Sequence, residues 1–160
     1  MTEREAAWKS TASISLYGRG ERLIIVPMGS EDGAIWFTLA DVQFEVTSAD
    51  DLAVGAAVRR ALSASVVGMP TPAADVIKGR VRATQRLAGA KSERDLNHHW
   101  AQVSVAVSGP HVQVVAWRTR LIKPHREPQY WGYKILEAPD DTALGKEVRE
   151  AVATAAVGTL

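Results

Sequence analysis

DDLAVGAAVRRA, at residues 50–61, returns as DDTALGKEVREA at residues 140–151, an offset of 90 positions. Between Ser48 and Ser65, 7 of 18 residues are identical to their counterparts 90 positions later. Both copies place apolar residues on one helical face and acidic residues at the start, where they favour the positive end of the helix dipole. Each also has an interior glycine, Gly55 and Gly145, although glycine there costs about 1 kcal/mol relative to alanine. The repeat predicts two related helices, and its glycines predict close packing of helix on sheet.

Segments with the patterns of strands precede each predicted helix. Some alternate polar and apolar residues, as half-buried strands do, and others, such as Leu23 to Val26, are continuously apolar. In the first half these segments cover 13–17, 23–26, 35–37 and 42–46, and Pro27 is expected to end the second of them. In the second half they cover 103–107, 112–117 and 131–136. Apolar residues are sparse in segment 73–99, which predicts one or two short helices.

The fold class expected from this order is α+β, with antiparallel strands and packed helices in two pseudo-symmetric strand-hairpin-plus-helix halves. A chain of 160 residues suits one domain, since single cores typically hold about 100–200 residues. The first half covers about 8–65, the connector 66–99 and the second half about 100–157.

Composition and charge restrict the possible chemistry. The chain has no cysteine, which excludes disulfides and thiolate catalysis, and no apolar run of the ~20 residues that a membrane helix needs. A cytoplasmic location is therefore expected. The formal net charge is +1, but residues 66–134 carry 11 basic and 4 acidic side chains while both flanks are acidic. Such asymmetry can steer a charged partner.

Catalytic, cofactor and metal sites are not indicated by any local motif. The glycines at Gly18 and Gly20 lack the third glycine of a nucleotide-binding loop. His98 and His99 are adjacent, so on a strand they would point to opposite faces and could not easily share a metal. The acidic pairs at the two helix starts are explained by helix capping. We therefore expect no enzyme activity, no cofactor and no metal.

The repeated helix, read as Asp-Asp-x-x-Ala-x-Gly-x-x-Val-Arg-x-Ala, resembles that of immunity proteins of bacterial contact-dependent growth inhibition (CdiI-like) systems. The surrounding order is also similar to theirs. It comprises Trp8-Lys9, the strand Leu23-Ile24-Ile25-Val26-Pro27, Ala61-Leu62-Ser63, the connector Gly68-Met69-Pro70-Thr71-Pro72 and the segment Ala88-Gly89-Ala90-Lys91-Ser92. The likeness covers most of residues 8–157 in short motifs and spacing. Residues 73–87 match poorly, and Trp117 stands where a strand-ending proline is expected.

This resemblance implies a protein that binds and neutralises the C-terminal toxin domain, often a nuclease, that a contact-dependent inhibition effector delivers to the cytoplasm. Tight association uses aromatic and arginine anchors together with charge complementarity. The partner-binding residues expected on this basis are Arg118, Arg120, Lys123, Arg126, Tyr130, Trp131, Glu31 and Asp32.

Two other functions stay open from the sequence. The first is a small nucleic-acid-binding protein or nuclease that uses the basic 118–134 segment, with His125 as general base. Against it, the pI of about 8.1 is below that of a dedicated nucleic-acid binder. The second is a non-catalytic domain that binds an unrelated protein.

Overall fold

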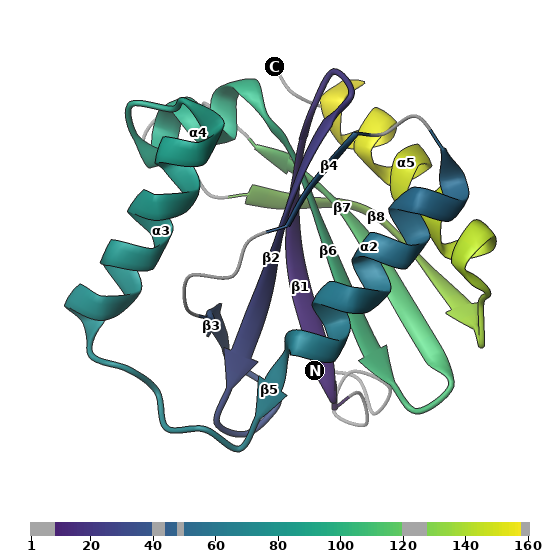
Figure 1. Cartoon of the computed structure of the whole chain (residues 1–160), viewed down its shortest axis with the longest axis horizontal. Coiled ribbons are helices and arrows are strands. Elements are labelled where there is room, and N and C mark those ends of the chain that lie inside the picture. Colours follow the sequence, from purple (N-terminus) through teal and green to yellow (C-terminus); the bar gives the residue numbers. More distant parts are fainter. Residues whose placement is uncertain (1–8, 40–43, 48–49, 120–127, 158–160) are drawn as a thin grey trace.

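The computed structural model describes residues 9–39, 44–47, 50–119 and 128–157, and it is an α+β structure built on one sheet. The described strands are Ala12–Arg19 (β1), Arg22–Ser30 (β2), Trp36–Thr38 (β3), Phe44–Thr47 (β4), Val66–Val67 (β5), Ala101–Ser108 (β6), His111–Thr119 (β7) and Pro128–Glu137 (β8). The sheet order is β3-β2-β1-β6-β7-β8, with β4 and β5 also paired to β2 (Figure 1). All of these pairings are antiparallel except the short one between β2 and β5.

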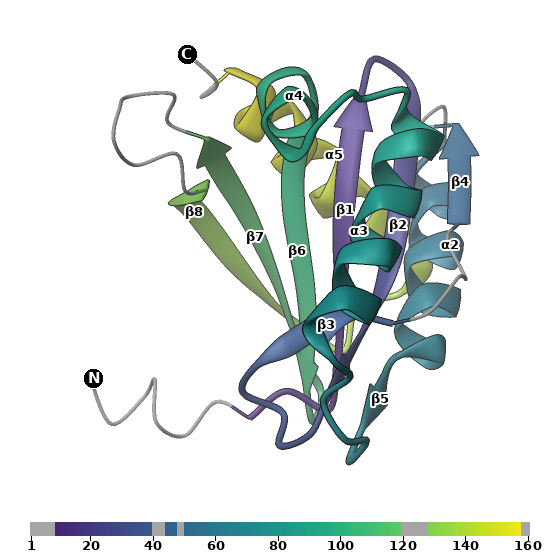
Figure 2. The same ribbon diagram turned by 90° about the vertical axis from the view of Figure 1, so that its left-hand side faces the viewer.

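Helices lie on both faces of the sheet. The described helices are Asp51–Ala64 (α2), Ala74–Ala88 (α3), Glu93–His99 (α4) and Asp141–Val157 (α5). α2 and α5 lie side by side on one face, whereas α3 and α4 lie on the other side near β1 and β2 (Figures 1 and 2). The strand residues explain this arrangement, because alternate residues of β2 face opposite layers: Leu23 and Ile25 join the α2/α5 core, and Ile24 and Val26 join the α3/α4 core.

The two halves are related by a pseudo-twofold arrangement centred on the pair β1–β6. Ser15 of β1 pairs with Ser104 of β6, and each of these strands continues into a hairpin with its successor, β2 or β7. Both hairpins turn at a glycine of positive φ, Gly20 (59°) and Gly109 (57°), a conformation that glycine adopts without the usual steric penalty. This arrangement confirms the two pseudo-symmetric halves inferred from the repeat.

The repeated glycines lie where α2 and α5 contact each other. A Cβ on Gly55 would overlap the carbonyl oxygen of Asp141, and a Cβ on Gly145 would overlap the carbonyl oxygen of Asp51. Each glycine therefore lets the start of the other helix approach its own backbone. The prediction that these glycines serve packing of helix on sheet is wrong, because the close contact is between the two helices.

The prediction that Pro27 ends the second strand is also wrong, since β2 continues to Ser30. The carbonyl of Pro27 accepts a hydrogen bond from the backbone N–H of Leu39, 3.0 Å away. The N–H and C=O groups of a residue in an antiparallel strand point to the same edge of that strand. Proline therefore lacks its N–H on the edge of β2 that faces away from β1. On that edge, Pro27 lies between the residues of β2 that pair with β4 and those that pair with β3. Proline is tolerated at such an edge position.

The connector contains two helices, in agreement with the prediction, but α3 is longer than expected, at 15 residues. Only Thr84 and Ala88 of this helix are buried, which explains why its apolar pattern is weak in the sequence. Gly89 ends the helix in a left-handed conformation, with φ of 69°, as is common at helix C-termini.

Candidate partner-binding surfaces

The basic and aromatic residues expected to bind a partner fall on and between the last two strands. Arg118 belongs to β7, and Tyr130 and Trp131 belong to β8. The pairing of the strands sets Trp117 opposite Tyr130 and Arg118 opposite Gln129, so Arg118 and Tyr130 are on neighbouring strands. β8 begins at Pro128, three residues before the start of the strand expected over 131–136. Arg120, Lys123 and Arg126 lie outside the described residues, as does His125.

The acidic turn after β2 is held together by Asp32. One oxygen of its carboxylate, Oδ1, accepts hydrogen bonds from the backbone N–H groups of Ala34 (2.9 Å) and Ile35 (3.3 Å) and from the Ser30 hydroxyl (3.4 Å). These bonds, with that from Ala34 the largest contribution, hold the pKa of Asp32 below its ordinary value. Asp32 thus has a structural role in the turn.

Glu31, like Asp32, is exposed. Its carboxylate accepts a hydrogen bond from the hydroxyl of Thr71, 3.3 Å away, in the segment between β5 and α3. Ile35, at the end of the same turn, is 78% exposed. The apolar sequence around Ile35 predicts a strand, and it carries no signal that marks Ile35 as a surface residue. Its position two residues after Gly33, whose φ is 81°, marks it as part of the turn.

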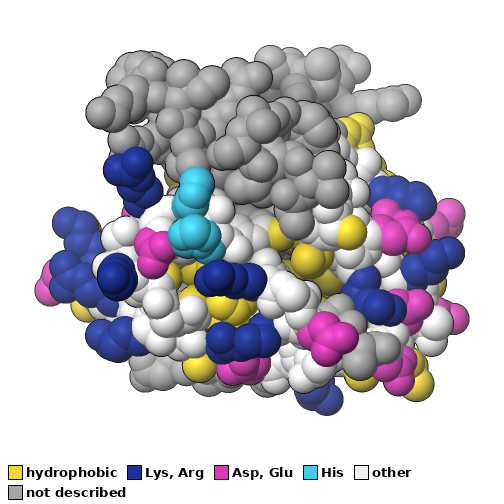
Figure 3. Space-filling view, turned by 90° about the horizontal axis from the view of Figure 1, so that it is seen from above, with side chains coloured by type: hydrophobic (Ala, Val, Ile, Leu, Met, Phe, Trp, Pro, Cys, Tyr) yellow, Lys and Arg dark blue, Asp and Glu magenta, His cyan; other side chains and the backbone are white. Residues whose placement is uncertain are grey.

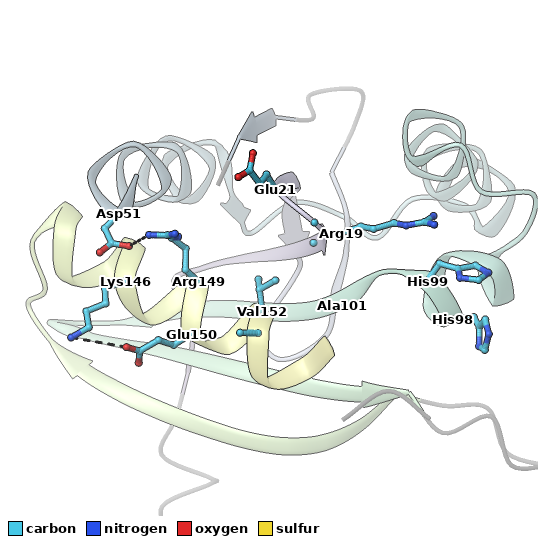
Figure 4. A pocket seen from close by; sticks show the side chains of 13 residues that line it. Arg19, Glu21, Asp51, His98, His99, Ala101, Lys146, Arg149, Glu150 and Val152 are labelled. Atoms are coloured by element: carbon cyan, nitrogen blue, oxygen red, sulfur yellow. Dashed lines mark hydrogen bonds and ion pairs between the residues drawn. The ribbon is translucent and has the colours of Figure 1, made fainter. Parts of the chain in front are cut away.

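A cleft of about 770 Å³ lies at the opposite end of the molecule, between the β1–β2 turn, the end of α4 and the outer side of α5 (Figures 3 and 4). Arg149 donates to Asp51 over 2.6 Å, and Lys146 lies 4.0 Å from Glu150 (Figure 4). Arg19 extends from β1 toward the side of α4 that carries His98 and His99 (Figure 4). The wall therefore combines both signs of charge, and part of that charge is neutralised within the protein.

His98 and His99 are the last two residues of α4. The expectation that they point to opposite faces of a strand therefore does not apply. Their rings are 4.6 Å apart between centroids in an edge-on arrangement, and His99 Nε2 lies 3.3 Å from an oxygen of Asp95. Among the described residues, no three histidine, aspartate or glutamate side chains come together to hold a metal ion. Among the same residues, no helix is long and apolar enough to cross a membrane.

Comparison with known proteins relates this fold to solved structures of low sequence identity. No family model matches the chain, and no curated protein matches its sequence. A protein of unknown function from Neisseria meningitidis is similar with a TM-score of 0.72 at 14% identity, over 92% of this chain and 98% of that one. A chain of the CdiA-CT/CdiI toxin and immunity complex from Yersinia pseudotuberculosis is similar with a TM-score of 0.67 at 15% identity, over 89% of this chain and 96% of that one. At these identities the likeness establishes a shared fold.

Proposed function

We propose that this chain is an immunity protein that binds and neutralises the toxin domain of a contact-dependent inhibition effector in the cytoplasm. The observation that carries the proposal is the shared fold with a chain of the CdiA-CT/CdiI toxin and immunity complex, over nearly the whole length of both chains. The repeated Asp-Asp-x-x-Ala-x-Gly helix independently resembles the immunity side of such systems. The repeat and the fold therefore support the same class of protein.

Two features of the described surface support a binding role. Its cleft holds paired charges, and exposed apolar side chains such as Ile35 stand beside polar turns. Buried apolar and arginine contacts at the centre of an interface contribute most of the affinity between proteins. We propose that Arg118, Arg120, Lys123, Arg126, Tyr130, Trp131, Glu31 and Asp32 contribute contacts of this kind, and that the toxin is a nuclease.

Calorimetric titration with the toxin domain encoded beside the gene of this chain tests the proposal. The expected result is one-to-one association in the nanomolar range, together with rescue of cells that express the toxin. A folded toxin domain that does not bind, and whose toxicity is unchanged, would exclude this function. The same toxin preparation, assayed on RNA and on DNA with and without this chain, tests the nuclease assignment.

A further inference from the structure

α3 carries a glycine that the fold does not explain. Gly79 is in the middle of the helix, where glycine is the poorest helix former after proline. Gly55 and Gly145 fit against the backbone of a neighbouring helix, but a Cβ on Gly79 would meet no atom within 4 Å. Packing within the described structure therefore does not require glycine at this position.

The same exposed face of α3 carries a row of cations. Lys78, Arg82 and Arg86 follow each other at intervals of four residues and are exposed, so they form a row along the helix with a rise of about 6 Å per step. None of the three forms an ion pair with a described residue. The helix has a single acidic residue, Asp75, in its first turn.

Apolar side chains flank this row. Val76, one turn before Gly79, is 43% exposed, and Leu87, beside Arg86, is 38% exposed. In the view from above, lysine and arginine side chains gather on the side of the molecule that carries α3 and α4 (Figure 3). α3 also lies in the connector, outside the repeated halves, so no internal symmetry constrains its surface.

We propose that the exposed face of α3, formed by Val76, Lys78, Gly79, Arg82 and Arg86, docks an acidic surface of the toxin domain. This proposal rests on the proposed function and adds to it a binding face and the charge of the partner. The missing side chain at Gly79 lets the partner approach the helix backbone, and its carboxylates meet the cations on either side. The exposed Val76 and Leu87 favour a protein over a nucleic acid, because they offer apolar contacts that a phosphate backbone does not use.

Substitution of Gly79 separates binding from folding. Gly79→Gln adds a long side chain with good helix propensity in open space, so thermal stability should be equal to or above that of the wild type. Its dissociation constant for the adjacently encoded toxin domain should rise at least tenfold in calorimetry. Ser63→Gln, at an exposed position of α2, is the matched control and should leave the dissociation constant unchanged.

Charge reversal tests the second element of the surface. The double variant Lys78→Glu/Arg82→Glu should weaken association with the toxin domain by at least tenfold and reduce its salt dependence, whereas Arg60→Glu on α2 should not. Both variants keep exposed positions exposed, and circular dichroism verifies their fold.

Three results would overturn the docking face. If Gly79→Gln and the double variant bind the toxin domain with the same dissociation constant as the wild type, α3 is excluded as the docking face. The proposed immunity function is then unaffected. A wild type that does not bind the folded toxin domain excludes both. Binding of single-stranded RNA or duplex DNA that is lost in the double variant, with toxin binding unaffected, would assign α3 to nucleic acid.

Discussion

Arg59 of α2 donates through Nε to the carboxylate of Asp141, the first residue of α5, over 2.6 Å. The mirror contact is made by Arg149 of α5, which donates to the carboxylate of Asp51 over 2.6 Å. Each arginine and each aspartate is separated from its counterpart by the 90 residues of the repeat. The preceding aspartates, Asp50 and Asp140, cap their own helices instead. Of each acidic pair, the first residue thus caps its own helix and the second binds the other helix.

Gly55→Ala should destabilise the protein strongly. The added Cβ would overlap the Asp141 carbonyl, which is backbone and cannot rotate away, so α2 and α5 must separate. Overpacking of this kind costs typically 1–3 kcal/mol, and we expect a loss of at least about 2 kcal/mol in the free energy of unfolding by chemical denaturation. Gly145→Ala should behave in the same way, by the symmetry of the contact.

Gly79→Ala is the matched control and should have the opposite effect. It is also in a helix interior, but its new methyl group meets open space. The expected gain is about 0.5–1 kcal/mol in the free energy of unfolding, because alanine favours helix and restricts the unfolded chain. Equal destabilisation at residues 55 and 79 would mean that close approach of the helices is not the cause.

The two interhelical ion pairs should contribute modestly and independently. Their side chains are 31–45% exposed, and pairs exposed to this degree contribute about 0.2–1 kcal/mol. A double-mutant cycle with Arg59→Met and Asp141→Asn should give a coupling free energy in that range. The corresponding cycle with Arg149→Met and Asp51→Asn should agree with it. A coupling near zero in both cycles would limit the role of the pairs to orientation of the helices.

Asp32 should support the turn after β2 only while it is ionised. Its pKa is lowered in the folded state, chiefly by the Ala34 N–H, so its contribution is present above the unfolded value of 3.8 and is lost as the pH falls through the folded value. Asp32→Ala should therefore lower the Tm at pH 7, and the difference from the wild type should narrow in strong acid. A difference in Tm that stays constant into strong acid would contradict a role for the ionised Asp32 carboxylate.

Tyr17 should cause a loss of stability in alkali. Burial, with a smaller contribution from the nearby Glu93 carboxylate, raises its pKa from 10.0 to about 12. The folded state therefore holds the proton more tightly than the unfolded state, so the stabilisation is complete below pH 10.0 and falls as the pH rises toward about 12. Tyr17→Phe should flatten this part of the stability profile. An unchanged slope in that variant would assign the alkaline loss to other groups.

The sequence predicted the strands of the two hairpins and both repeated helices because their apolar patterns are regular and local. In β1, for example, Ile14 and Leu16 are buried, and Ser15 between them is partly buried. The contact between α2 and α5 was not predicted. A repeated glycine indicates that another group packs close to the helix backbone, but the sequence does not identify that group. Only the fold shows that the neighbour is the backbone of the other copy.

The exposure of residues on the candidate surface could be predicted less well than the fold. Charge and aromatic character are visible in the sequence, but exposure is not, and Ile35 was assigned to a strand although it is 78% exposed. The structural role of Asp32 depends on the backbone conformation of residues 32–35, which brings two N–H groups to its carboxylate. The sequence does not show this conformation. Within α3, Gly79 stood out only once its surroundings were known to be empty.

The reciprocal exchange between the halves has a consequence for how such a chain can be assembled. Each half contains one arginine, one aspartate and one glycine of the interface, which is the composition that a self-complementary surface requires. Two copies of one half, paired about a true twofold axis, would make two equivalent ion pairs and two equivalent glycine contacts, the same number as the chain itself makes. The connector therefore links two modules whose interacting surfaces are equivalent and self-complementary. It also raises their effective concentration. Because the two halves are separate segments of one chain, the sequence of one half can change independently of the other.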